Sequence, residues 1–276
     1  MMYRTYIPAL LLLLVLFLNS CQKRAGKSEE HYLKGNDLVL KDDLVNARKE
    51  YEQSIEADTM NWKAYYQLGG VCQLEGKFQD AIYYFEKAVK VNPKFTLGYY
   101  NKANLEDFLG NEKQSMKDFK TTIELKKDFF SAILAKARKE YSQGKYDLAI
   151  ADLTDAINVR PDFYMAYSMR GSSKYQMKDY AGAIQDFDME IKYAPTHIMG
   201  YVNRAVANGE LKKYREAIGD LNTALQVDPL WSQAYIYRGV FYNMLKVKDS
   251  GCGDFRMAFK LKNPQAESYM KEYCGK

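Results

Sequence analysis

Four cysteines and two histidines carry most of the reactive side-chain chemistry of this 276-residue chain. His31 and His197 lie far apart, and neither stands in a cluster of cysteines and carboxylates at metal-binding spacing. The carboxylates Asp147, Asp152 and Asp155 are spaced to form the solvated face of one helix, and no glycine-rich phosphate loop occurs. The sequence therefore predicts no catalytic residues, no metal and no cofactor, and an enzyme is the least favoured class.

Cys21 follows a segment that is typical of a secretion signal. Arg4 gives it a basic start, an apolar run covers residues 9–18, and Ser20 precedes the cysteine. The apolar run is well short of the ~20 residues that span a bilayer. The small residue before Cys21 resembles the lipobox of bacterial lipoproteins, which implies a cleaved signal peptide over residues 1–20 and a fatty-acid (palmitate) anchor on Cys21. Cleavage without lipidation and a retained anchor remain open as alternatives.

The residues after this cysteine predict where the protein lies. Residues 21–27 form a tether in which Lys23, Arg24 and Lys27 occur without an acidic residue. Basic side chains are attracted to anionic lipid headgroups, although a plain solvated linker fits the same residues. The acidic segment that directs some lipoproteins to the cell surface is absent. We expect a lipid-anchored protein of the bacterial cell envelope, at the outer membrane and facing the periplasm.

The overall charge argues against nucleic acid as a partner. Lys and Arg total 40 and Asp and Glu total 35, and the net charge of +5 is spread along the chain. Nucleic-acid binding usually requires a concentrated basic patch, and secretion would place the protein in another compartment.

The remaining sequence repeats with a period of 34 residues. Aligned blocks end at Pro93, Pro161, Pro195 and Pro229. With the first position of a unit set at Trp62, the period gives seven units: 28–61, 62–95, 96–129, 130–163, 164–197, 198–231 and 232–265. This period is typical of a helical solenoid, in which each helix pair buries its apolar face against the next pair.

Small and large residues alternate at fixed positions of the unit. Position 8 is always glycine or alanine: Gly35, Gly69, Ala103, Ala137, Gly171, Ala205 and Gly239. Position 24 is always large: Tyr51, Phe85, Phe119, Leu153, Phe187, Leu221 and Phe255. These patterns predict closely approaching helices with large side chains between them. The tyrosines at position 4 are predicted in the same core. Glu190, at a position that is otherwise small, is predicted to snorkel towards solvent, and a buried partner or a local opening of the repeat are the alternatives.

This combination of small, aromatic and proline positions resembles the tetratricopeptide repeat over nearly all of the chain after the signal. The resemblance implies an all-α, right-handed superhelical solenoid of seven helix pairs, with residues 266–276 forming a capping helix. The third unit departs from the pattern at Lys127, where proline is expected. In this family, positions 2, 5, 6, 9, 12 and 13 of each first helix line a concave groove.

Tyrosines and amides recur at those positions. The candidate groove residues are Tyr32, Asn36, Tyr66, Gln73, Tyr100, Asn101, Asn104, Arg138, Tyr141, Tyr175, Asn203 and Tyr237. Such side chains stack on other side chains and hydrogen-bond an extended backbone, so the predicted function is a scaffold that binds a protein or peptide partner. For the tyrosines at position 5, packing between repeats is the alternative. A self-associating envelope protein and a wall-acting enzyme are the alternative functions.

The last two cysteines predict a disulfide. Cys252 lies 11 residues before Asn263 and Cys274 lies 11 after it. If Asn263 and Pro264 form the turn between antiparallel helices, both cysteines stand at the same height, and a bridge would add about 3 kcal/mol. Two unrelated buried thiols are the alternative. Cys72 lies among core positions and is interpreted as a free thiol.

Overall fold

The computed structural model describes the backbone of residues 6–275 and the side chains of residues 22–275. All regular secondary structure in these residues is α-helical, which confirms the predicted fold class. The chain divides into two compact units, an N-terminal unit (Met1–Ala132) and a C-terminal unit (Ile133–Lys276).

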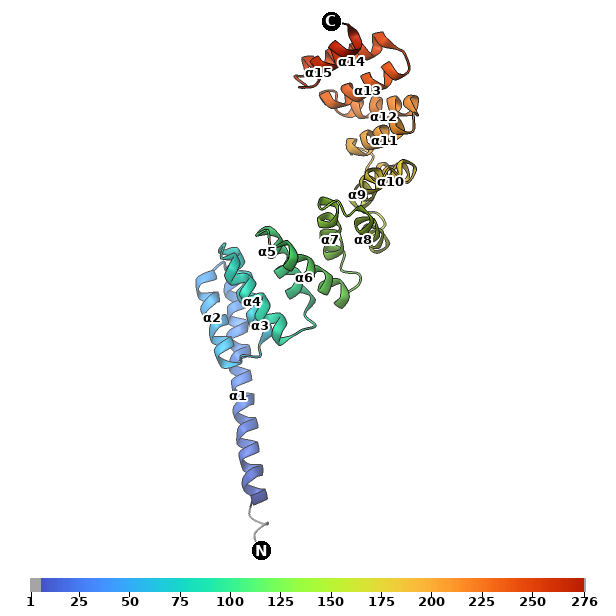
Figure 1. Cartoon of the computed structure of the whole chain (residues 1–276). Coiled ribbons are helices and arrows are strands. Elements are labelled where there is room, and N and C mark those ends of the chain that lie inside the picture. Colours follow the sequence, from blue (N-terminus) through green and yellow to red (C-terminus); the bar gives the residue numbers. More distant parts are fainter. Residues whose placement is uncertain (1–5, 276) are drawn as a thin grey trace. The chain divides into compact units, whose positions relative to one another are not determined.

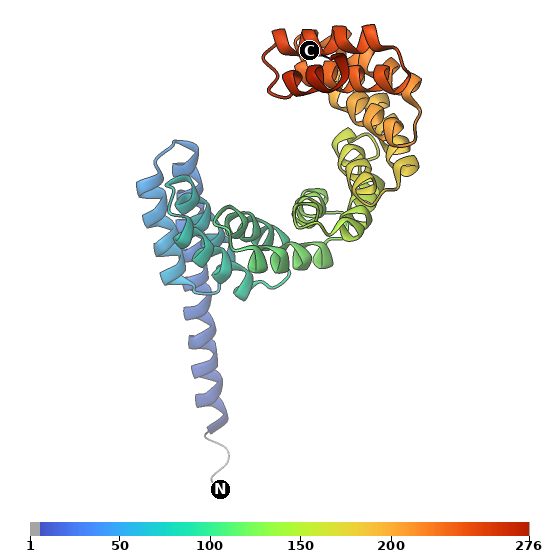
Figure 2. The ribbon, with the colours of Figure 1, turned by 45° about the horizontal axis from the view of Figure 1, so that its top comes forward.

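In the N-terminal unit, each helix packs against the next one along the chain (Figure 1, Figure 2). Its helices are α1 (Tyr6–Leu40), α2 (Leu44–Ala57), α3 (Trp62–Leu74), α4 (Phe78–Val91), α5 (Thr96–Phe108) and α6 (Glu112–Leu125), followed by the start of α7 (Phe130–Ser142). One core cluster includes Tyr51, Leu68, Phe85 and Leu105, which come from four successive helices. The core of this unit is therefore continuous from one helix pair to the next.

The C-terminal unit continues the same arrangement from the rest of α7. It contains α8 (Tyr146–Val159), α9 (Tyr164–Gln176), α10 (Tyr180–Tyr193), α11 (Ile198–Glu210), α12 (Tyr214–Val227), α13 (Ser232–Met244), α14 (Lys248–Lys260) and α15 (Ala266–Cys274). The last helix covers the end of the array, because Ala266 is buried and Tyr269 and Tyr273 lie against Phe255. The structure joins Cys252 of α14 to Cys274 of α15 in a disulfide, with Cα atoms 5.8 Å apart.

A residue with left-handed backbone conformation lies two positions after the end of each first helix. Repeat position 15 has positive φ in all seven units, where it is Asp42, Gly76, Gly110, Gly144, Lys178, Lys212 and Lys246. Glycine adopts this conformation without strain, whereas a residue with a Cβ atom loses roughly 1 kcal/mol. The last three units therefore turn at lysines that are less favourable than glycine.

The small residues at position 8 make room for the large residues at position 24. A Cβ atom added to Gly35 would lie 2.5 Å from the Tyr51 ring, and one added to Gly171 would lie 2.7 Å from the Phe187 ring. Where position 24 is the smaller Leu153 or Leu221, position 8 is alanine. The sizes of these two residues are therefore matched in six of the seven units, and the third unit, with Ala103 and Phe119, is the exception.

A row of ion pairs, one within each of five successive helix pairs, joins the residue at position 7 of the first helix to the residue at position 23 of the second helix. The five pairs are Lys102–Asp118, Lys136–Asp152, Arg170–Asp186, Arg204–Asp220 and Arg238–Asp254. The aspartate side chains are between 3% and 18% exposed, so these charges are largely removed from water. The prediction that Asp152 lies on a solvated face is therefore wrong. Asp147 and Asp155 are exposed, as predicted.

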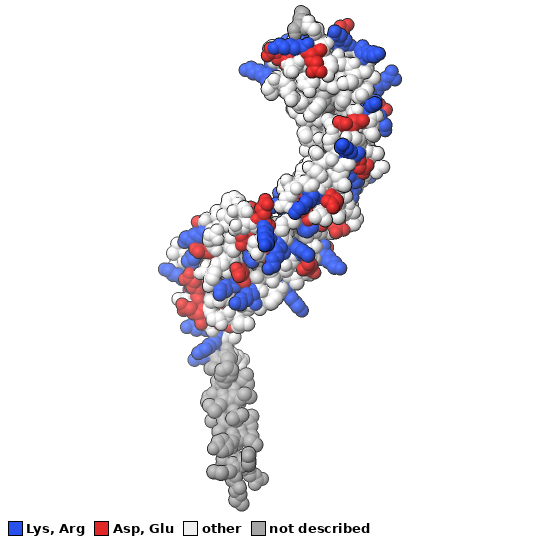
Figure 3. Space-filling view, viewed as in Figure 1, with Lys and Arg blue, Asp and Glu red and all other residues white. Residues whose placement is uncertain are grey.

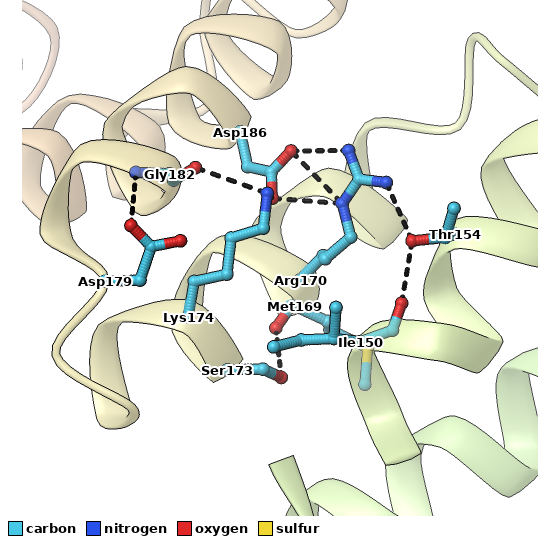
Figure 4. A network of polar contacts seen from close by, with 9 residues as sticks. All are labelled: Ile150, Thr154, Met169, Arg170, Ser173, Lys174, Asp179, Gly182 and Asp186. Carbon is cyan, nitrogen blue, oxygen red and sulfur yellow. Dashed lines mark hydrogen bonds and ion pairs between the residues drawn. The ribbon is translucent and has the colours of Figure 1, made fainter. Parts of the chain in front are cut away.

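The arginines of this row also reach the preceding helix pair. Arg170 donates to Asp186 through Nε and Nη2, and its Nη1 donates to Thr154 Oγ1 at 3.0 Å (Figure 4). Arg204 and Arg238 make the equivalent contacts to Asp188 and Asn222, at 2.6 and 2.7 Å. A single guanidinium thus fixes both the pair to which it belongs and the distance to the pair before it.

The predicted snorkelling of Glu190 is wrong, and the structure agrees with the alternative that this carboxyl has a partner. Its side chain is fully buried instead of reaching solvent, and its Oε1 lies 2.8 Å from Nδ1 of His197. Burial raises the pKa of the Glu190 carboxyl, and the hydrogen bond with His197 opposes this shift. Gly200 provides the space, because a Cβ atom there would lie 3.2 Å from the carboxyl carbon.

The position 4 tyrosines lie less deeply than predicted. Tyr167 is buried, but Tyr201 and Tyr235 are only half-buried. The hydroxyls of all three donate to a proline carbonyl near the end of the preceding unit. These residues join successive repeats as well as filling the core.

The predicted signal peptide and the predicted lipidation at Cys21 fall on side chains outside the described residues. The backbone of this region belongs to α1, and the side chains of residues 22–27 are exposed. Among the residues that the structure describes, no helix has the length and apolar character needed to cross a membrane.

Candidate partner-binding site

The C-terminal unit contains a pocket of about 390 Å³ beside its first helices. The lining residues come from α7, α9, α11 and α13, with one residue from α10 and one directly before α13: Tyr141, Ser172, Tyr175, Gln176, Phe187, Met199, Val202, Asn203, Val206, Trp231, Gln233 and Tyr237. We call this the C-terminal pocket. It brings together four predicted groove residues, Tyr141, Tyr175, Asn203 and Tyr237, from four successive helix pairs.

The chemistry of the C-terminal pocket is aromatic and amide, and none of its lining residues carries a formal charge. Glu210 is next to one of the lining residues, because its Oε1 accepts a hydrogen bond from the Tyr175 hydroxyl at 3.2 Å. Burial and the negative charge of Glu210 raise the pKa of Tyr175 to about 12, so this tyrosine is neutral and acts as a hydrogen-bond donor. The pocket can therefore enclose apolar groups and hydrogen-bond a peptide backbone.

The N-terminal unit has a second pocket, of about 260 Å³, which we call the N-terminal pocket. It is lined by Tyr32, Trp62, Lys63, Tyr66, Gln67, Phe95 and Leu97. The Lys63 ammonium lies 5.8 Å from the centre of the Tyr32 ring, so this pocket includes a positive charge that the C-terminal pocket lacks.

The position 5 tyrosines take part in both groove and core. Tyr66 lines the N-terminal pocket, and its ring also packs 5.5 Å from Phe85 and 4.8 Å from Phe95. Tyr100 lies outside both pockets and packs 4.9 Å from Phe129. Removing these rings would therefore reduce stability as well as change the surface.

The other predicted groove residues line neither of these two pockets. Asn36 accepts hydrogen bonds from Tyr51 and Gln67, and Asn101 donates to the Tyr66 hydroxyl at 2.8 Å. These amides connect neighbouring helices, which leaves them fewer groups for a ligand. Asn104 is half-buried, and Gln73 and Arg138 are exposed.

The pockets also contain residues that the sequence reasoning missed. Phe95 and Trp231 occupy position 34, directly before the next first helix, so the rule based on first helices did not include them. Val206 and Met199 stand at groove positions 9 and 2, but the prediction selected tyrosines and amides and left out apolar residues. Listing every residue at the six groove positions would have found these two.

Charged residues of both signs are mixed over the face shown in Figure 3, with no broad area of one sign. Within residues 22–275, no group of three or more His, Cys, Asp or Glu side chains is arranged to hold a metal ion. Cys72 is a free, buried thiol whose Sγ accepts a hydrogen bond from Nη2 of Arg48 at 3.4 Å.

The helix pairs define a helical repeat protein. Tetratricopeptide repeats are present in the chain, because models of that family match residues 62–95, 98–129 and 134–197.

Solved structures share the fold at low sequence identity. The C-terminal part of a tetratricopeptide repeat-containing protein from Cytophaga hutchinsonii has a TM-score of 0.71 and 16% identity, with 87% of this chain and 99% of that chain covered. A tetratricopeptide repeat protein from Parabacteroides merdae has a TM-score of 0.57 and 20% identity, covering 89% and 98%. YrrB, described as a TPR protein with an unusual peptide-binding site, has a TM-score of 0.61 and 15% identity, covering 67% and 95%.

A curated protein also matches in sequence. Protein bimA of Emericella nidulans is 33% identical over 78 residues, which are 26% of this chain. The matched stretch is 10% of bimA, so this similarity does not extend to the whole of that protein.

Proposed function

We propose that this chain is a non-enzymatic scaffold that holds a protein partner by binding one of its peptide segments along the first helices. The observation that carries the proposal is the C-terminal pocket, in which uncharged aromatic, amide and apolar side chains from four helix pairs face one space. Apolar surface would supply affinity, and the amides of Asn203 and Gln233 would hydrogen-bond the backbone of the segment.

We further propose that the scaffold is attached by a lipid on Cys21 and faces the periplasm. The signal-like residues 1–20, the serine before Cys21 and the basic tether support this location. The lipid would fix the protein at the membrane, and the repeats would present the partner beside it.

The experiment that tests this function is a crosslinking pull-down from membranes of cells that express the full chain. Tyr237→Ala should lose a specific partner, while Tyr83→Ala should keep it, because Tyr83 is 53% exposed on the second helix α4. Equal recovery of the partner with both variants would show that the partner does not bind through the C-terminal pocket on the first helices.

Self-association is a second candidate function, and it has its own observation. Leu40, Leu74 and Phe108 occupy repeat position 13 in three successive units and are 87%, 69% and 70% exposed. A second copy of the chain could cover this apolar row. Sedimentation of the full chain with Leu74→Asp and Phe108→Asp tests it: a change from dimer to monomer supports self-association, and an unchanged monomer rejects it.

A further inference from the structure

We propose that the C-terminal pocket binds an uncharged aromatic or large aliphatic side chain of the partner, and that Glu210 binds a lysine or arginine close to that anchor in the same segment. This inference rests on the proposed function and specifies the partner chemistry of its site.

The interior of the pocket excludes a charged anchor. Its floor contains Val202, which is 3% exposed, Phe187, which is 2% exposed, and the half-buried Val206. A charged group placed there would lose its hydration without gaining an opposite charge, because none of the lining residues is ionised. A neutral, apolar side chain meets no such cost.

The size and walls of the pocket fit one or two large side chains. A volume of about 390 Å³ lies at the lower end of the roughly 300–1,000 Å³ typical of ligand pockets. Tyr141, Tyr175, Trp231 and Tyr237 provide ring faces and edges against which an aromatic or aliphatic anchor can stack.

Charge complementarity identifies the residue beside the anchor. Glu210 is exposed and forms no ion pair with a lysine or arginine of the described chain, and its hydrogen bond from Tyr175 fixes it next to the pocket. A lysine or arginine of the partner at the edge of the pocket would form an ion pair with the Glu210 carboxylate. The N-terminal pocket has the opposite character, because Lys63 is part of its lining.

The test is selection of a random 12-residue phage-displayed peptide library on the immobilised full chain, followed by fluorescence anisotropy with the enriched peptides. We expect enriched peptides to share an uncharged bulky residue with a lysine or arginine nearby. Replacing the bulky residue by alanine should weaken binding at least tenfold, and replacing the basic residue should weaken it about threefold.

Three variants of the full chain locate the binding. Tyr237→Ala should weaken binding about tenfold. Asn203→Asp keeps the shape of the side chain while adding a charge inside the pocket, and it should weaken binding about fivefold even if Tyr237→Ala folds poorly. Glu210→Gln should weaken the binding only of those peptides that contain the basic residue. Asn158→Ala is the matched control, since this asparagine is exposed on the second helix α8.

The outcomes separate the inference from the proposed function. Peptides with acidic anchors, or peptides whose binding depends on Tyr66 but not on Tyr237 or Asn203, would overturn the inference and leave groove binding in place. No enrichment, or enrichment of peptides insensitive to every first-helix variant, would overturn both.

Discussion

The ion pair between Arg170 and Asp186 gives the sharpest test of how the repeats are held together. Asp186 accepts from Arg170 at 2.6 Å and from Lys174 at 2.8 Å, and its side chain is 3% exposed (Figure 4). Asp186→Ala would leave two cations without their counter-charge. Removing one partner of a buried pair typically costs about 3–5 kcal/mol, so we expect a loss of about 3 kcal/mol, because both cations retain some access to water.

The same helix provides a matched control. Asp188 also accepts a hydrogen bond from an arginine, Arg204, but its side chain is 51% exposed. Exposed pairs contribute about 0–1 kcal/mol, so Asp188→Ala should change stability by less than about 1 kcal/mol. The triple variant Arg170→Met, Lys174→Met and Asp186→Leu should recover most of the loss, because apolar residues can replace a buried charge cluster at little net cost.

The assay is amide hydrogen exchange in α9 and α10, combined with urea unfolding followed by circular dichroism. Repeat arrays open locally, so exchange reports the stability of the affected helix pair more directly than a global midpoint does. A loss below about 1 kcal/mol for Asp186→Ala, or equal losses for Asp186→Ala and Asp188→Ala, would refute the reasoning from burial.

Four further predictions follow from single residues. Burial raises the pKa of Glu190, so its contribution to stability falls as pH rises from about 4.5 through that raised value; Glu190→Gln should raise the melting temperature at pH 8 and less so at pH 5, and parallel curves would contradict this. Lys212→Gly should raise the free energy of unfolding by about 0.5–1 kcal/mol in urea titrations, because Lys212 has φ of +59°. Cys252→Ser should lower the melting temperature under oxidising conditions only, and an equal loss in reductant would argue against the bridge. Cys21→Ala should abolish labelling by radioactive palmitate and release the protein from membranes, whereas continued membrane association would reject the lipid anchor.

The repeat period and the pattern of small and large residues were sufficient to predict the helix pairs. Each of these features is local, since glycine or alanine at position 8 faces the large residue of the same unit at position 24. The spacing of 16 residues between the basic residue at position 7 and the aspartate at position 23 was equally visible in the sequence. It was missed because charged residues on a helix normally face solvent, as Asp155 does.

The candidate site was less predictable because it depends on which side chains interact with each other. Asn36 and Asn101 stand at groove positions, yet their amides are bonded to neighbouring helices. Trp231 enters the C-terminal pocket from the turn before α13, where helical periodicity gives no guidance. Glu190 was assigned to solvent because a buried carboxylate is costly, and its contact with His197 depends on a residue seven positions later.

The central claim is that a partner segment binds along the first helices, and site-specific photocrosslinking in cells tests it most directly. A photoreactive amino acid is placed at Tyr237 in the C-terminal pocket or at the exposed Asn158 on the second helix α8 of the full chain. The account predicts a discrete adduct with another protein from the Tyr237 position and none from the Asn158 position. Adducts from Asn158 alone, or the same adducts from both positions, would contradict it.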